Sequence, residues 1–218
     1  MTFSIAGRCA RTGMLGAVVT TSSMAVGGRC AFAAAGVGAV LTQHRTDPRL
    51  GPRVLECLRA GAAPDAVLRD LEAQGDGIGW RQVATIDAQG RAALLHGDRI
   101  SSIHAGRIGK DCVAAGNILR NTDTVDAMVA AFEANEGEPL PERLLRAVEA
   151  GDGAGGELKQ LKSAGLLVVH EQPFPYVDLR VDLDPHPLAQ LRFLWELYQP
   201  LADEYVTRAL SPDGMRAL

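Results

Sequence analysis

The sequence has few cysteines, no excess of basic residues and no long apolar run, and each of these features excludes a class of protein. Its four cysteines are widely separated, none forms a C-x-x-C pair, and no histidine stands at metal-ligand spacing from them. This argues against a zinc site and a disulfide framework, so we expect reduced thiols, no metal and no cofactor. The cysteines are Cys9, Cys30, Cys57 and Cys112.

Charge and hydropathy exclude further partners. The net charge is −4, with acidic and basic residues interspersed, so no basic footprint for nucleic acid exists. The apolar run from Met14 to Val26, preceded by Arg8 and Arg11, imitates a secretory signal, but the polar residues 20–23 interrupt it. No uninterrupted apolar stretch approaches the roughly 18 residues of a membrane-spanning helix. We therefore expect a cytoplasmic protein with no nucleic-acid or membrane partner, folded as one domain over residues 1–218.

Catalytic sequence motifs are absent as well. The chain contains no G-x-x-x-x-G-K-[ST], no G-x-S-x-G and no H-E-x-x-H, and Gly36-Val-Gly38 lacks the rest of a dinucleotide fingerprint. Short motifs alone would therefore leave the chain as a globular α+β domain.

The first residues of the chain carry the clearest pattern. Apolar residues alternate over 2–8 and 14–21 around Thr12-Gly13, which predicts a β-hairpin. A strand that begins at Thr2 would hold its hydroxyl and α-amine at a fixed point. A free α-amine can act as the base for the hydroxyl of its own residue. The alternative is that Thr2 is an ordinary β-branched strand residue.

The rest of the chain alternates strands with pairs of helices. We predict strands over 36–43, 81–87, 91–96, 112–117, 163–169 and 176–183. Helices are predicted from Asp47 to Gly61, from Pro64, from Thr122 or Asp123, over 140–150, and over about 187–210 with a bend at Pro200. This order favours antiparallel sheets covered by helices over a βαβ alternation.

The pattern as a whole resembles DUF1028, a family of unknown function grouped with the N-terminal-nucleophile (Ntn) hydrolases. The resemblance covers nearly the whole chain in the correct order. It departs at Cys9-Ala10, where the family has Asp-Pro, and at His96-Gly97, where it has Thr before Gly. It also departs over 155–163, where the family has Gly-Gly-Asp-x-Arg-Gly-x-Gln-Ser and this chain has Gly-Gly-Glu-Leu-Lys-Gln-Leu-Lys-Ser. The matching segments are Met1–Ile5, Thr12-Gly13, Ala25–Gly27, Ala35–Val40, Thr42-Gln43, Gly51–Arg53, Ile86–Arg91, Ala115–Leu119, Asp126–Met128, Ala131-Phe132, Gly155-Gly156, Ser163-Ala164 and Asp178–Asp182.

The resemblance implies an αββα four-layer sandwich with two antiparallel sheets, and a site for amide hydrolysis. Thr2 would be the nucleophile once Met1 is removed, because only then is its nitrogen a free amine. Ser22, with Ser23, would hydrogen-bond that amine, or would cap a turn instead. Asn117 would donate to the oxyanion, or would form an Asn turn after Gly116.

Four further residues are candidates for substrate binding, namely Gln43, His96, Asp178 and Arg180. Asp178 and Asp182 flank Arg180, and the three side chains can form an internal salt-bridge ladder, which is the interpretation we favour. Alternatively, Arg180 binds a substrate carboxylate through two hydrogen bonds. His96 and His104 are structural histidines by default.

We thus expect an Ntn-type hydrolase that cleaves an amide-type bond in a small polar molecule. One alternative is a non-catalytic small-molecule binding protein on the same fold, and another is a structural subunit. The last helix carries an apolar band that is too wide to pack against a single surface. The band consists of Leu188, Leu191, Leu194, Trp195, Leu197, Tyr198, Leu201 and Tyr205. It predicts a homodimer.

Overall fold

The larger of two antiparallel sheets has the N-terminal strand near its centre. In the computed structural model, which describes residues 2–75 and 77–214, its strand order is β10-β9-β2-β1-β8-β7. The N-terminal hairpin is confirmed, and its turn needs glycine because Gly13 has a φ of +75°. The strands are β1 (Thr2–Arg8), β2 (Leu15–Thr21), β7 (His104–Gly109), β8 (Cys112–Asn117), β9 (Ser163–Val169) and β10 (Pro175–Val181).

The second sheet has four strands in the order β3-β4-β5-β6. It consists of β3 (Ala31–Ala34), β4 (Gly38–His44), β5 (Arg81–Asp87) and β6 (Ala92–His96). An apolar core of small side chains, including Ala6, Ala17 and Ala84, fills the space between the two sheets. Small residues permit close approach of the sheets, so the polar side chains at the strand ends face one another across a narrow gap.

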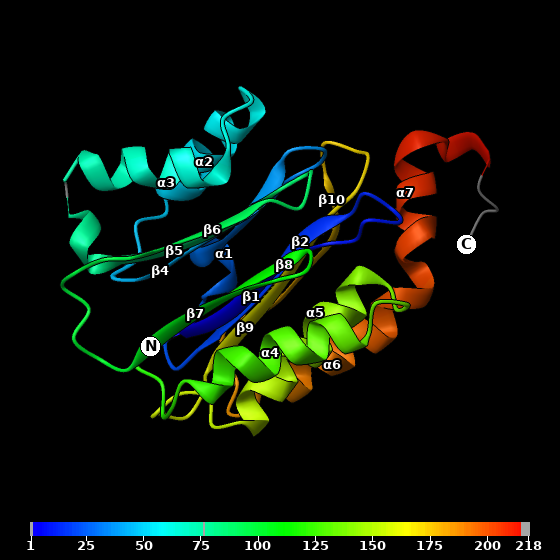
Figure 1. The fold of residues 1–218 in the computed structure, drawn as a ribbon. Helices are drawn as coiled ribbons and strands as arrows, with labels where there is room; N and C mark the ends of the chain where they lie inside the picture. The colour runs from blue at the N-terminus through cyan, green and yellow to red at the C-terminus, as the bar shows by residue number, and fades with distance from the viewer. Residues whose placement is uncertain (1, 76, 215–218) are drawn as a thin grey trace.

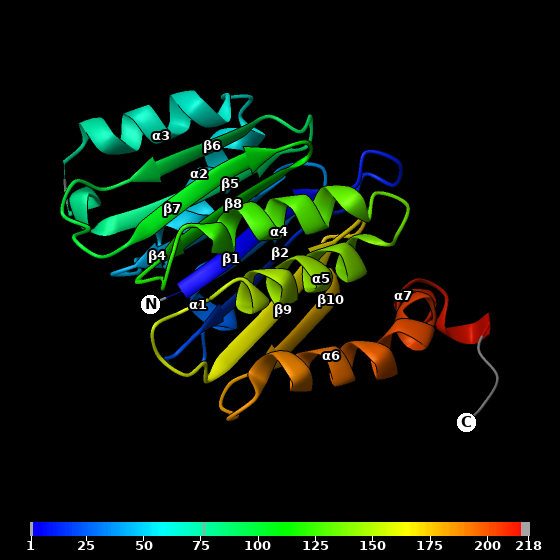
Figure 2. The ribbon, with the colours of Figure 1, turned by 60° about the horizontal axis from the view of Figure 1, so that its bottom comes forward.

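Helices cover the outer face of each sheet (Figure 1). The short α1 (Gly27–Cys30) follows β2, and α2 (Leu50–Arg59) and α3 (Pro64–Ala73) cover the smaller sheet through their own apolar core. On the larger sheet, α4 (Asp123–Ala134), α5 (Leu140–Gly153) and α6 (Pro187–Tyr198) lie side by side (Figure 2). Phe132, Leu144 and Trp195 belong to the core beneath them. The order of layers is helix, sheet, sheet, helix.

The last predicted helix is interrupted. It divides into α6 and α7 (Ala202–Leu210), with a 3₁₀ turn at Gln199–Leu201, and α7 runs at a steep angle to α6 (Figure 1). The break falls at Pro200, which has no N–H to donate and whose ring clashes with the preceding turn. The predicted helical segment from about 187 to 210 and its predicted bend at Pro200 are therefore confirmed, with the bend dividing the segment into two helices. Further 3₁₀ turns lie at Ile78–Trp80 and Pro212–Gly214.

Candidate functional site

A row of polar side chains crosses the larger sheet at one end of its strands. In register, Thr21 lies opposite Ser163, and Asn117 lies opposite both Thr2 and His104. The Thr2 hydroxyl donates to the Thr21 hydroxyl at 3.3 Å. Since Val19 and Ala115, two residues away on their strands, belong to the core between the sheets, the row faces the same space.

A second row faces the first from the smaller sheet. It consists of Gln43, Gln82 and His96 on three adjacent strands. Gln82 Oε1 accepts hydrogen bonds from Gln43 Nε2 at 2.6 Å and from Asn117 Nδ2 at 3.0 Å. Ser4 Oγ donates to Gln43 Oε1 at 2.7 Å. The two sheets are thus joined by side-chain amides, with Gln82 at the centre of the network.

Histidines lie at the outer end of both rows. Gln82 Nε2 is 2.9 Å from His96 Nδ1, and the His96 and His104 ring centroids are 5.3 Å apart. Burial, and then the neighbouring His104, lowers the pKa of His96. Because an amide nitrogen has no lone pair to offer, His96 Nδ1 must be the acceptor in this contact. The neutral imidazole is consistent with both observations.

Backbone strain is found beside this site. His44 follows Gln43 with a φ of +72°, and Ile118 follows Asn117 with a φ of +54°. The left-handed region is unusual for any residue with a side chain and is an outlier for β-branched isoleucine. Such strain persists only where the surrounding structure imposes it, and it clusters at functional sites.

Glu157 adds a carboxylate to the first row. It is 4% exposed, both of its oxygens lie 3.2 Å from the Ser22 backbone nitrogen, and Leu119 pairs with it in an isolated β-bridge. Burial raises the pKa of Glu157 to about 7, against hydrogen bonds from Ser22 and Thr21 that lower it. A chain of contacts therefore runs from Thr2 through Thr21 to a carboxyl group that titrates near neutral pH.

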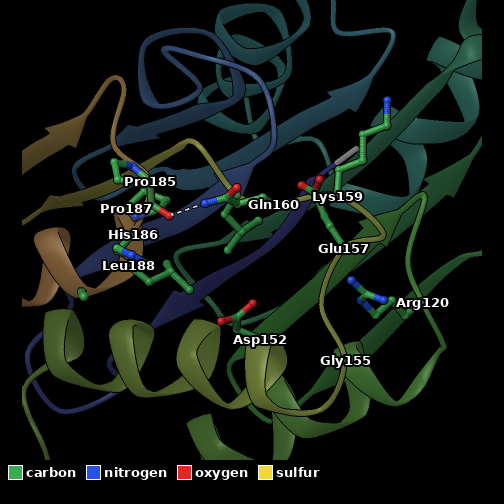
Figure 3. Close-up of a pocket in the computed structure, with 12 residues that line it drawn as sticks. Arg120, Asp152, Gly155, Glu157, Lys159, Gln160, Pro185, His186, Pro187 and Leu188 are labelled. Carbon is green, nitrogen blue, oxygen red and sulfur yellow. Dashed lines mark hydrogen bonds between the residues drawn. The ribbon is translucent and has the colours of Figure 1, made fainter.

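A cavity of about 460 Å³ lies next to Glu157. Arg120 and Glu157 stand on one side of it and Pro185–Leu188 on the other, with Asp152 reaching in from α5 (Figure 3). Gln160 Nε2 donates to the Pro185 carbonyl across it at 3.1 Å. Partial burial raises the pKa of Asp152. Side chains of both charge signs and apolar side chains line this cavity, so it suits a small polar molecule.

Most of the predicted site residues come together. Thr2, Ser22 and Asn117 lie at the first row, and Gln43 and His96 lie in the second. Glu157 and Gln82 were missed by sequence reasoning. The one sequence signal for Glu157 is that the resembling family has another acidic residue, Asp, at this position after Gly155-Gly156.

Asp178 and Arg180 lie elsewhere. They stand on the edge strand β10, which β9 and β2 separate from β1, and Arg180 binds Asp178 through two hydrogen bonds of 2.8 Å. With Gly27 and Phe32 they line a different hollow of about 570 Å³. The default prediction was a salt-bridge ladder of Arg180 with Asp178 and Asp182, and its Arg180–Asp178 pair is confirmed. The pair is partly exposed rather than buried, because β10 has a free edge.

The structure also bears on metals and membranes. In residues 2–75 and 77–214, no three His, Cys, Asp or Glu side chains gather so that they could hold a metal ion. Cys9, Cys30, Cys57 and Cys112 are free thiols. Every helix within these ranges is too short or too polar to span a bilayer.

Two packed antiparallel sheets with helices on both outer faces, and a polar site at one end of their strands, define a mixed α/β protein. The model of a family of unknown function, DUF1028, matches residues 2–191, and the chain belongs to this family. It is similar to the crystal structure of protein SPO2555 from Silicibacter pomeroyi, itself assigned to DUF1028. The TM-score is 0.84 at 32% sequence identity, over 90% of this chain and 85% of that one. No curated protein matches.

Proposed function

We propose that the protein is an Ntn-type hydrolase that cleaves an amide-type bond in a small polar molecule, with Thr2 as the nucleophile. The observation that carries the proposal is the position of Thr2. It opens a central strand, its hydroxyl contacts Thr21, and Thr21 contacts a carboxyl group with a pKa of about 7. A carboxyl group that can ionise near neutral pH can stabilise a protonated amine close to it.

The order of the helix and sheet layers also supports the proposal of an Ntn-type hydrolase. Two facing antiparallel sheets between helix layers agree with the αββα sandwich of Ntn enzymes, in which the nucleophile begins a strand. In this chain, β1 has neighbours on both sides, β2 and β8, which fix the position of Thr2. A nucleophile held by a rigid element is more precisely placed than one on a loop.

The chemistry requires that processing leaves Thr2 as the first residue. Thr2 Oγ1 would then attack the amide carbon while its proton passes to the α-amine of the same residue. The C–N bond breaks as the amine leaves with a proton, and water hydrolyses the ester left on Thr2. Glu157, next to Ser22, would hold the charge of the protonated α-amine.

The experiment uses protein made to begin at Thr2, with the first residue verified by intact mass. Incubation with a β-lactone should acylate the Thr2 hydroxyl and add the full mass of the lactone. Thr2→Ala should abolish the adduct and Thr2→Ser should keep it, because serine retains a hydroxyl. A matched Thr12→Ala variant, in the β1–β2 turn, should react as the parent does. Equal labelling of the parent and the Thr2→Ala protein would contradict the proposal.

A second candidate function is small-molecule binding without catalysis. The observation in its favour is that Thr2 is 5% exposed and Asn117 fully buried, within a network that already links both sheets. In this case the cavity beside Glu157 would hold a ligand, and no Thr2 adduct would form although ligand binding is measurable.

We also propose that the protein is a homodimer. Phe193 and Leu197 on α6 are 51% and 56% exposed, and Leu201 and Tyr205 continue the exposed apolar side chains toward α7. A cluster of large apolar side chains on one helical segment is typical of an interaction surface. Light scattering at micromolar concentration tests this assembly.

A further inference from the structure

The side-chain oxygen of Asn117 is the one unexplained polar atom of the two rows. Asn117 is 0% exposed, and its Oδ1 is buried with no hydrogen-bond partner among the residues that the structure describes. Most buried side-chain polar atoms in proteins are hydrogen-bonded, so an exception at a candidate site requires an explanation.

The orientation of the Asn117 amide is fixed by its neighbours. Gln82 Nε2 lies 2.9 Å from the Gly116 carbonyl and 3.2 Å from the Ala105 carbonyl, so this end of Gln82 must be the nitrogen. The other end, Oε1, can only accept, and it lies 3.0 Å from the Asn117 side chain. Asn117 must therefore turn its nitrogen toward Gln82 and its oxygen away, because the reverse would place two acceptors together.

This orientation changes the expected role of Asn117. One of its two N–H groups is held by Gln82, and the group that lacks a partner is an acceptor rather than a donor. The prediction that Asn117 stabilises an oxyanion needs a donor pointing at the substrate. The acceptor in this position can recognise an N–H, in addition to any donation by the second N–H of the amide.

The register places this acceptor beside the proposed nucleophile. Thr2 and Asn117 are paired residues on adjacent antiparallel strands, and their side chains share one face. Such pairs have Cβ atoms about 4.5–5.5 Å apart. The nitrogen of an amide is about 1.33 Å from its carbonyl carbon. One amide group can therefore present its carbon to Thr2 Oγ1 and its N–H to Asn117 Oδ1.

We infer that Asn117 Oδ1 is a specificity-determining acceptor for the N–H of a bound primary or secondary amide. The inference deepens the proposed function, on which the choice of an amide ligand rests. Esters and tertiary amides lack the N–H and would leave the oxygen unsatisfied. A site built to bond such a group rejects analogues that lack it far more strongly than an apolar pocket rejects a change in size.

The test measures binding without chemistry. Full-length ¹⁵N-labelled protein carrying Thr2→Ala is titrated with acetamide and, separately, with N,N-dimethylacetamide, which keeps the carbonyl but has no N–H. The backbone amide resonance of Gly116, which every variant retains, reports binding. Acetamide should shift this resonance saturably, with an affinity at least about tenfold higher than that of N,N-dimethylacetamide.

Two variants test whether Asn117 is the residue that causes the preference for acetamide. Asn117→Leu should remove the preference for acetamide, while Asn135→Leu, the same change at the remote end of α4, should keep it. Should Asn117→Leu fail to fold, the comparison of the two probes in the protein that retains Asn117 still decides the question. Equal affinity for both probes, or no shift with either, overturns the inference.

The result of this binding test can be distinguished from the result of the β-lactone test of the proposed hydrolase function. Preference for acetamide in a protein whose Thr2 never forms an adduct would leave the acceptor role standing and refute the hydrolase. Adduct formation at Thr2 without any preference between the probes would do the reverse.

Discussion

Glu157→Gln should change how the stability of the protein depends on pH. The pKa of this carboxyl is raised on folding from 4.5 to about 7, because it is buried. Between these values the folded chain binds more protons than the unfolded chain, so stability falls as pH rises through this window. At 1.36 kcal/mol per pH unit the full effect is about 3 kcal/mol, of which about 2 to 3 kcal/mol falls between pH 5 and pH 8.

Glutamine preserves the shape and can still accept a bond from the Ser22 nitrogen, but it does not titrate. The free energy of unfolding of Glu157→Gln should therefore not fall between pH 5 and pH 8 as that of the parent does. At pH 8 the variant should be more stable than the parent. Urea unfolding at pH 5 and pH 8, followed by circular dichroism, measures both proteins. Glu56→Gln, an exposed change on α2, is the control for the loss of one carboxylate. Parallel pH dependence in the parent and in Glu157→Gln would refute the reasoning and remove Glu157 from the proposed mechanism.

Three shorter predictions concern packing, assembly and the edge strand. Gly7→Ala should cost about 1 to 3 kcal/mol in thermal or urea unfolding, because a Cβ there would lie 2.6 Å from the buried Phe132 ring. Phe193→Glu should convert the proposed dimer to monomer by light scattering without lowering the melting temperature of the fold; an unchanged mass would contradict the α6 interface. Arg180→Ala should cost less than about 1 kcal/mol in unfolding, because its ion pair is partly exposed; a loss of several kcal/mol would show that the pair is effectively buried.

Periodicity in the sequence was sufficient to predict the longer helices and strands, but it did not reveal the short or glycine-containing strands. The β1–β2 hairpin, β5 and β9 were predicted within a residue or two of their bounds, because alternation is sustained there. β3 and β7 were missed. Ala31–Ala34 has four residues, mostly alanine, and β7 contains two glycines, so neither has a local preference for extended backbone. Pairing with β4 and β8 creates both strands.

The candidate site was predictable in part. Thr2 was found because it begins an alternating strand, and Asn117 because it ends one after Gly116. Gln82 was missed, since a glutamine in an alternating strand usually faces solvent. It is buried here because the larger sheet covers its face, which no short stretch of sequence records. The burial and hydrogen bonding of Gln82 depend on residues 20 to 35 positions away in the sequence, such as Ala105 and Asn117.

The central position of β1 also has a consequence for protein synthesis. Its partner β2 is made immediately afterwards, but its other neighbour, β8, ends at Asn117. At about 5 to 20 residues per second, a ribosome needs about 5 to 20 s to make the chain between the two. During that interval one side of β1 has no strand to pair with, so the nascent hairpin is open to chaperones and to any enzyme that trims the chain start. Removal of Met1, which the proposed chemistry requires, is therefore best placed before the larger sheet closes around Thr2.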